Sequence, residues 1–181
     1  MEPPVDFSLC KEVFETFGER RLIGRGEYFA RSGEVMENAG WIVSGGFKYA
    51  LTSSDGNNRV IGFSLDDSLL IDYESVMHYT KMRTDIIALE DSEVLAIPAK
   101  ILRERLNGDH ELNMNLMIGL FEQLYDQFLE FSNLTPAQRY LQPLDRYPRI
   151  KEIASYGDIA SYLNISRRQL QRIRETISKE I

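Results

Sequence analysis

The rhythm of hydrophobic and polar positions changes along the chain, and each change marks a predicted element. Residues 6–18 place aromatic and aliphatic side chains at helical spacing and end on Gly18, where a C-terminal cap would sit. From about Arg21 to Pro98 the pattern becomes a series of short runs rich in β-branched and aromatic residues, such as GWIVSGGFKYAL and NNRVIGFSL, broken by glycines. This pattern predicts a short packing helix followed by an antiparallel β-barrel or jelly roll.

Two segments refine the predicted barrel. The cluster at 54–57, SDGN, supplies residues that tolerate a positive φ and therefore predicts a hairpin turn. Around 69–79 the strand rhythm lapses into LLIDYESVMHY, which predicts a turn of helix inside the barrel. Strand-like DIIALEDSEVLAIP follows, and Pro98 ends the strand region.

A long amphipathic helix is predicted after the barrel, beginning near Asn107, whose side chain is a suitable N-cap. Leu112, Leu116 and Leu120 form a stripe that would pack on the barrel of the same chain. A second set of large side chains follows the a/d spacing of a coiled coil: Met114, Met117, Phe121, Leu124, Phe128 and Phe131. We therefore expect this helix to pair two chains, with a fully buried helix in a monomer as the alternative.

Three further helix starts are predicted from capping chemistry. In a capping box, an oxygen side chain accepts from a free backbone amide, and the side chain three positions later accepts from the amide of the capping residue. The three starts lie at 135–138 (TPAQ), 155–158 (SYGD) and 166–169 (SRRQ). Only about three residues separate the helix at 156–163 from the one that follows. That spacing predicts a helix-turn-helix whose second helix enters the major groove of DNA.

Side-chain size and polarity fit this motif. Ala160 is small enough for close helix approach, and Leu170 and Ile173 are the inward anchors of the last helix. Its outward residues are Arg167, Arg168, Gln169, Gln171, Arg172 and Arg174. Arg167 and Arg172 can bind guanine in bidentate fashion, and Gln169 can bind adenine or a phosphate. The alternative is a solvated amphipathic helix with no DNA contact.

Charge is distributed unevenly along the chain. The whole sequence has a net charge of −7, whereas residues 134–181 carry nine Lys/Arg and five Asp/Glu. This last segment is therefore +4 and the remainder is −11. Such an asymmetry indicates a basic functional module on an acidic carrier.

The residue inventory argues against catalysis and metal binding. Cys10 is the single cysteine and His78 and His110 are the two histidines, so one chain offers no disulfide, no iron–sulfur cluster and no multi-histidine metal site. We therefore expect a protein that is not an enzyme and has no catalytic residues. No stretch has the apolar length of a membrane span or the character of a signal peptide, so we expect a cytoplasmic protein with no membrane partner.

At this point the chain resembles the Crp/Fnr family of transcription regulators, and among them the Bacteroidetes-type members. GEYFARSGEV, WIVSGGFKY and IIALEDSEVLAIP look like parts of the family's cyclic-nucleotide-binding barrel, and DIASYLNISRRQLQRIRETI looks like its helix-turn-helix. The resemblance implies that Ser166, Arg167 and Arg172 contact phosphates and bases. Arg168 stands where members that respond to cyclic AMP carry an acid, which implies a different operator.

The segment at 69–79 coincides with the family's phosphate-binding cassette, where a Gly-Glu pair binds the ribose and an Arg-Ser pair grips the cyclic phosphate. Here Ile71-Asp72 and Met82-Arg83 stand at those positions, so the arginine comes one residue late, and one step along a strand reverses the face to which a side chain points. The candidate ligand-binding residues are Asp72, Ser75 and Arg83. Cyclic AMP is therefore a poor match, and another small effector or a barrel without a ligand are the alternatives.

The sequence thus predicts an α+β protein in three parts: a barrel sensor domain over 1–106, a dimerisation helix over 107–133 and a helix-turn-helix domain over 134–181. The segment 147–153 leaves little room for strands, so any wing would be short or absent. The expected partners are double-stranded DNA and a second copy of the chain, with a small effector and RNA polymerase as further candidates. The rival interpretation is a sensor or protein-interaction module whose helix-turn-helix does not bind DNA.

Overall fold

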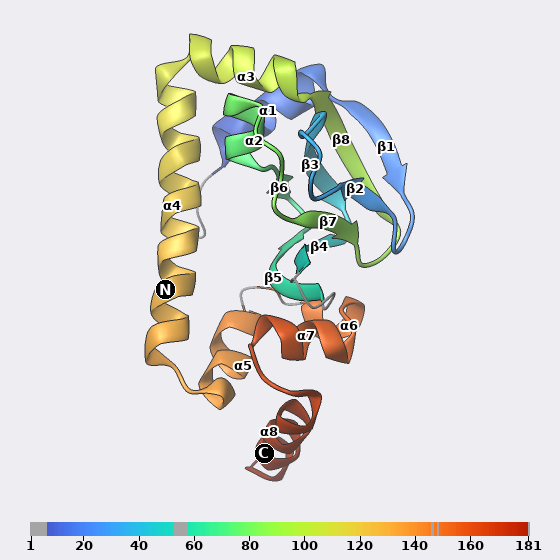
Figure 1. The fold of residues 1–181 in the computed structure, drawn as a ribbon, viewed down its shortest axis with the longest axis vertical. Helices are drawn as coiled ribbons and strands as arrows, with labels where there is room; N and C mark the ends of the chain where they lie inside the picture. The colour runs from blue at the N-terminus through green and yellow to red at the C-terminus, as the bar shows by residue number, and fades with distance from the viewer. Residues whose placement is uncertain (1–6, 53–57, 146, 148, 181) are drawn as a thin grey trace.

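The computed structural model describes residues 7–52, 58–145, 147 and 149–180, so the predicted turn at 54–57 lies outside the described residues. The elements follow one another as in Figure 1. In chain order they are α1 (Ser8–Phe17), β1 (Glu19–Ile23), β2 (Tyr28–Ala30), β3 (Asn38–Ser44), β4 (Gly46–Thr52), β5 (Asn58–Leu65), β6 (Ser68–Leu70), α2 (Tyr73–His78), β7 (Asp85–Ala88), β8 (Ser92–Pro98), α3 (Ala99–Gly108), α4 (His110–Asn133), α5 (Pro136–Asp145), α6 (Ile150–Ile153), α7 (Tyr156–Tyr162) and α8 (Arg167–Glu180).

The strands form two antiparallel four-stranded sheets, which confirms the predicted jelly roll. One sheet has the order β1-β8-β3-β6 and the other has the order β2-β7-β4-β5. The largest fully buried side chains between them include Ile42, Phe47, Ile86 and Ile97. Every connection between consecutive strands crosses from one sheet to the other, except that β4 leads to β5 within one sheet.

The lapse of strand rhythm at 69–79 contains α2, as predicted. Asp72 starts this helix as its N-cap, because its side chain accepts a hydrogen bond from Ser75 N at 2.9 Å. Tyr79 ends the helix in the left-handed conformation with φ 58°. Pro98 ends β8, as its lack of an amide hydrogen led us to expect.

The prediction that the long helix begins near Asn107 is wrong. Asn107 lies inside α3, a helix that the hydrophobic pattern did not reveal and that contains the expected boundary between 106 and 107. Asp109 caps α4 instead, accepting from Leu112 N at 3.0 Å. The physical reason is that the chain is already helical at Asn107, because α3 starts directly after Pro98 and continues to Gly108. An N-cap is therefore needed only at the break between α3 and α4.

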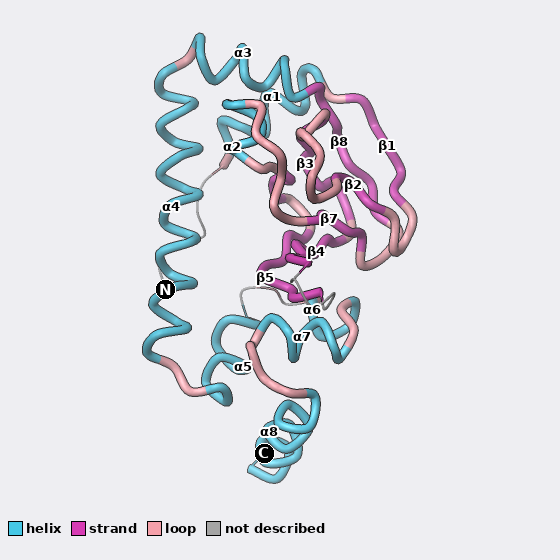
Figure 2. Tube along the Cα trace, viewed as in Figure 1, coloured by secondary structure: helices cyan, strands magenta, loops and turns pink. Residues whose placement is uncertain are grey.

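The C-terminal helices lie below the barrel, and α4 runs along its side to reach them, as Figure 2 shows. They share a second apolar core with the barrel, separate from the core between the sheets. The barrel contributes Val60, Phe63, Leu65 and Leu89, and the helices contribute Tyr140, Ile150, Ile159, Ala160, Tyr162, Leu163 and Leu170. We call α5–α8 the C-terminal helical domain and this shared core the joint.

Candidate nucleic-acid interface

Two of the three predicted capping boxes form with both hydrogen bonds. Thr135 N donates to Gln138 Oε1 at 3.0 Å, and Gln138 N donates to Thr135 Oγ1 at 3.4 Å. Ser166 N donates to Gln169 Oε1 at 2.9 Å, and Gln169 N donates to Ser166 Oγ at 3.2 Å. Each box satisfies two backbone donors that a helix start leaves free, so α5 and α8 begin where the sequence predicts.

The cap at Ser155 works through an aspartate instead. Asp158 N donates to Ser155 Oγ at 3.0 Å, and Ser155 Oγ donates to Asp158 Oδ2 at 2.7 Å. The shorter aspartate side chain thus meets the serine hydroxyl and leaves its other oxygen free for a further partner. That oxygen contacts the barrel, as described below.

A tight turn joins α7 to α8, as in a helix-turn-helix. Asn164 takes the left-handed conformation with φ 54°, which asparagine tolerates better than most residues. Ile165 N then donates to Ala160 O at 3.0 Å and closes the turn. Ala160, Leu163 and Leu170 are buried, so the two helices hold each other through small and aliphatic side chains. The predicted inward anchors are confirmed, and Ile173 packs against the same core.

The opposite face of α8 is exposed and basic. Arg167, Arg168, Gln169, Gln171, Arg172 and Arg174 are all exposed. Several of these side chains already have a contact within the chain: Gln169 answers the cap, Gln171 donates to Glu175 Oε1 at 2.9 Å, and the Arg174 guanidinium lies 5.5 Å from the centre of the Tyr156 ring. Arg168 and Arg172 have no side-chain partner among the described residues, which leaves their donors available to a ligand.

Arg167 packs against the start of α7. A Cβ placed on Gly157 would lie 2.5 Å from Arg167 Nη2 and 3.0 Å from its Cζ, so the guanidinium occupies the space that a side chain at 157 would fill. Glycine at this position therefore allows Arg167 to lie across the first turn of α7. Sequence reasoning missed Gly157, because its effect depends on a neighbour ten positions away.

The predicted dimer seam is the exposed face of α4. Phe121, Leu124 and Phe128 are each 65% exposed, and Met114 and Met117 are nearly half exposed. Ile118, Tyr125 and Leu129 widen the same apolar face, and the Phe121 and Tyr125 rings stack with their centres 5.8 Å apart.

Phe131 differs from the other seam residues. It is half-buried, with its ring centre 6.1 Å from that of Tyr162, and so it packs at the joint. The other stripe of α4 behaves as predicted, because Leu112 and Leu116 are buried in the barrel core and Leu120 packs against it.

The three candidate ligand-binding residues are engaged within the chain. Asp72 caps α2, and Ser75 is buried, with its hydroxyl donating to Thr80 O at 2.7 Å and accepting from Met36 N at 2.8 Å. The Arg83 side chain is 80% exposed and lies 3.6 Å from Glu74 Oε2 at the surface. The structure therefore brings Asp72 and Ser75 together but leaves Arg83 in solvent.

The remaining candidate chemistry is sparse. Among the described residues, no group of three or more His, Cys, Asp or Glu side chains could hold a metal ion. Burial raises the pKa of the Cys10 thiol to about 11 and that of the Tyr49 hydroxyl to about 12, which keeps both groups neutral at physiological pH. The helices of the described part of the chain are too short or too polar to cross a membrane.

Comparison with known proteins supports the assignment of the barrel. Residues 20–109 match the family model of the cyclic nucleotide-binding domain. No curated protein sequence matches the chain.

Solved structures match nearly the whole chain. FixK2 from Bradyrhizobium japonicum superposes with a TM-score of 0.76 at 18% identity, over 90% of this chain and 85% of that one. The c-di-GMP responsive global regulator CLP from Xanthomonas campestris has a TM-score of 0.68 at 14% identity, over 94% and 91%. The catabolite activator protein of Thermus thermophilus has a TM-score of 0.59 at 19% identity, over 98% and 88%. At these identities the likeness is one of fold.

Proposed function

Residues 20–109 are a cyclic nucleotide-binding domain within a chain that has the fold of Crp/Fnr-type regulators, and from this premise we propose that the protein is a sequence-specific DNA-binding transcription regulator that acts as a homodimer. The observation that carries the proposal is the exposed basic face of α8, which follows a tight helix-turn-helix turn and includes two arginines with no side-chain partner among the described residues. A recognition helix needs such a face, because base edges in the major groove are read by donors that are free to reach them.

We assign different roles to the residues of this face. Arg168 and Arg172 are the candidates for direct base contacts, with Gln171 beside them. Ser166 and Gln169 cap the helix and place its N-terminus, whose free amides favour a phosphate. Arg167 lies across the start of α7, which suits a contact to the DNA backbone better than a contact to a base.

The exposed apolar face of α4 forms the interface between the two chains of the dimer. Large hydrophobic side chains that remain this exposed in one chain form a contiguous patch of the kind that marks an interface. Pairing two α4 helices would relate the two recognition helices by a two-fold axis. Such a dimer reads half-sites about 34 Å apart on a roughly palindromic operator.

The cassette residues do not fit a cyclic phosphate. Met82, at the position of the family's arginine, is buried in the core, and Arg83 lies in solvent. One carboxylate oxygen of Asp72 is engaged in the cap of α2, where it accepts from Ser75 N. We therefore propose that DNA binding does not require cyclic AMP, and that any effector is a different small molecule.

Selection of binding sites from a random DNA pool tests the proposal. The purified protein is incubated at fixed, moderate salt, with and without cyclic AMP, beside Arg172→Ala and the control Arg21→Ala, which removes an exposed arginine of the barrel. We expect a palindromic sequence to be enriched by the wild type and the control, and to be lost with Arg172→Ala. No enrichment under either condition would favour either a missing effector or the rival function, in which the helix-turn-helix contacts another protein.

A further inference from the structure

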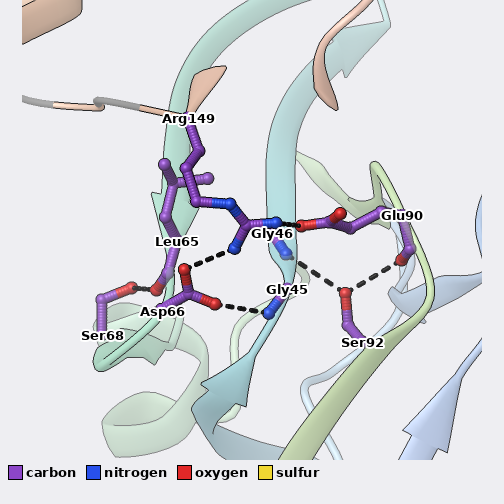
Figure 3. A network of polar contacts seen from close by, with 8 residues as sticks. All are labelled: Gly45, Gly46, Leu65, Asp66, Ser68, Glu90, Ser92 and Arg149. Atoms are coloured by element: carbon purple, nitrogen blue, oxygen red, sulfur yellow. Dashed lines mark hydrogen bonds and ion pairs between the residues drawn. The ribbon is translucent and has the colours of Figure 1, made fainter. Parts of the chain in front are cut away.

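Arg149 stands where the C-terminal helical domain meets the barrel, and it takes part in a ring of polar contacts (Figure 3). Its Nη1 lies 2.6 Å from Asp66 Oδ2, and its Nη2 lies 2.7 Å from Glu90 Oε1. The other oxygen of Asp66 accepts a hydrogen bond from Gly45 N at 2.6 Å. One planar guanidinium therefore holds two carboxylates from different turns of the barrel.

Ser92 completes the ring on the barrel side. Its hydroxyl accepts from Gly46 N at 3.1 Å and donates to Glu90 O at 2.9 Å. Gly45 has φ +108°, and a Cβ there would lie 2.1 Å from Ser92 Oγ. Only glycine fits this position, so the close approach of the turns is built into the sequence.

All three turns in the ring connect the two sheets. Gly45 lies between β3 and β4, Asp66 between β5 and β6, and Glu90 between β7 and β8. The strands β3, β6 and β8 belong to one sheet, and β4, β5 and β7 belong to the other. These turns are three of the connections through which a change in the spacing of the sheets is taken up, and Arg149 is bonded to two of them.

Arg149 is also tied firmly to the C-terminal helical domain. The next residue, Ile150, is fully buried in the joint. Ile153 presses on the β3–β4 turn, since a Cβ on Gly46 would lie 2.6 Å from Ile153 Cδ1. The helix α6 then leads through Ala154 directly into the capped start of α7. A displacement of Arg149 has a short path to the helix-turn-helix.

Two further polar contacts at the joint hold α7 to one sheet. Lys48 of β4 pairs with Asp158, and Val60 N of β5 donates to Ser161 Oγ at 2.9 Å. Both strands belong to the same sheet. Arg149 differs from these links because its partners lie on turns that lead to the second sheet.

We propose that Arg149 is a positioning residue that couples the spacing of the two barrel sheets to the orientation of the helix-turn-helix. The consequence for DNA rests on the function proposed above, whereas the coupling itself is a property of the chain alone. The two ion pairs are partly exposed, so solvent screening limits their effect on stability. Their role is geometric: together they fix one orientation of α6 on the barrel.

Hydrogen exchange of the full chain without DNA tests the coupling. We compare wild type, Arg149→Gln, Ser92→Ala and the double variant, following amides of residues 150–163. Ser68→Ala is the matched control, because the Ser68 hydroxyl donates to Leu65 O beside the ring without belonging to it. Arg149→Lys retains the charge but lacks the planar fork that holds two carboxylates.

We expect Arg149→Gln to raise the amide exchange rates of residues 150–163 about three- to fivefold. This is the effect on a local opening equilibrium that we expect from the loss of two partly exposed ion pairs. Ser92→Ala should raise it in the wild-type background and add nothing in the Arg149→Gln background. Arg149→Lys should exchange faster than wild type, and Ser68→Ala should match wild type. Additive effects of Ser92→Ala and Arg149→Gln, or wild-type exchange in Arg149→Lys, would overturn the proposal.

Two further measurements keep the outcomes separate. If Arg149→Gln does not fold, Glu90→Gln removes one of the two pairs and must show the same dependence on Ser92. In DNA binding, Arg149→Gln should lower operator affinity about fivefold without changing the salt dependence, because Arg149 binds carboxylates of the barrel and releases no counterion from DNA. If the wild type binds no DNA at all, the proposed function fails. The hydrogen-exchange result still shows whether Arg149 couples the barrel to the helix-turn-helix.

Discussion

Lys48 Nζ lies 2.7 Å from Asp158 Oδ1, and this ion pair joins β4 of the barrel to the first turn of α7. The two side chains are only 22% and 17% exposed. Asp158 also receives the Ser155 hydroxyl on its second oxygen, so one carboxylate both caps a helix and links the two parts of the chain. We therefore expect the loss of Asp158 and the loss of Lys48 to change the free energy of unfolding by different amounts.

We predict that Asp158→Ala destabilises the protein more than Lys48→Ala. Asp158→Ala leaves a mostly buried ammonium without its carboxylate and removes the cap partner, for which we expect a loss of about 2–4 kcal/mol in the free energy of unfolding. Lys48→Ala leaves Asp158 with Ser155 and the helix N-terminus, so about 1 kcal/mol is expected. Urea unfolding measures both, and an equal loss in the two variants would contradict the dual role of Asp158.

A second prediction concerns Gly157→Ala. The added methyl group would displace the Arg167 guanidinium, which can move because it is the end of a flexible side chain. Alanine also favours a helix by up to about 1 kcal/mol over glycine, so we expect unchanged or higher stability. Operator affinity should nevertheless fall several-fold, as in Arg167→Ala.

Combining the two changes tests whether they act through the same contact. Gly157→Ala should add little to Arg167→Ala, and Arg167→Ala should lower the salt dependence of binding by about one phosphate contact, with similar losses on all DNA sequences. Arg172→Ala should instead relax the preference at one base position. A base-specific loss in Arg167→Ala would show that this arginine reads a base.

A third prediction tests the dimer. Phe121→Glu combined with Leu124→Glu places charges on two of the most exposed apolar positions of α4, so we expect a folded monomer. Leu22→Glu is the matched control, because Leu22 is even more exposed but lies on β1. Sedimentation at micromolar concentration measures the outcome. A double variant that stays dimeric would place the interface elsewhere.

Local chemistry explains why much of the candidate interface was predictable. The caps at Thr135, Ser155 and Ser166 depend on residues a few positions apart, and all three form in the structure. Short runs of β-branched residues broken by glycines likewise predict the strands of the barrel. Periodicity identified the buried leucine stripe of α4 for the same reason, since residues three and four apart share a helix face.

The joint could not be predicted, because it depends on residues distant in sequence. Lys48 and Asp158 are 110 positions apart, and Arg149 meets Asp66 across 83. Nothing in the local pattern around Arg149 distinguishes it from a solvated arginine. The sequence predicts the start of α4 at Asn107 because several polar residues there can cap a helix, whereas Asp109 is the residue whose side chain accepts from Leu112 N.

The last prediction concerns the pH dependence of stability. Burial raises the pKa of the Cys10 thiol to about 11, above its ordinary value of 9.0, so the folded protein favours the neutral thiol more than the unfolded chain does. The resulting contribution to stability is complete below about pH 9 and is lost as the pH rises toward 11. A thiol reagent should therefore react slowly with the native protein at pH 8, because the thiolate is the reactive form.

Cys10→Ala separates this contribution from that of other groups. The variant should be less stable at neutral pH, because a small buried side chain becomes smaller still, but its free energy of unfolding should fall less steeply than that of the wild type between pH 9 and 11. Urea titrations at several pH values in this range measure the slopes. In the structure, α1 packs on the barrel core through Cys10 and Phe14, whose ring contacts Trp41. Parallel slopes in the two proteins, or rapid modification of the native wild type at pH 8, would contradict the prediction. Either result would mean that α1 opens and exposes Cys10 far more often than this packing allows.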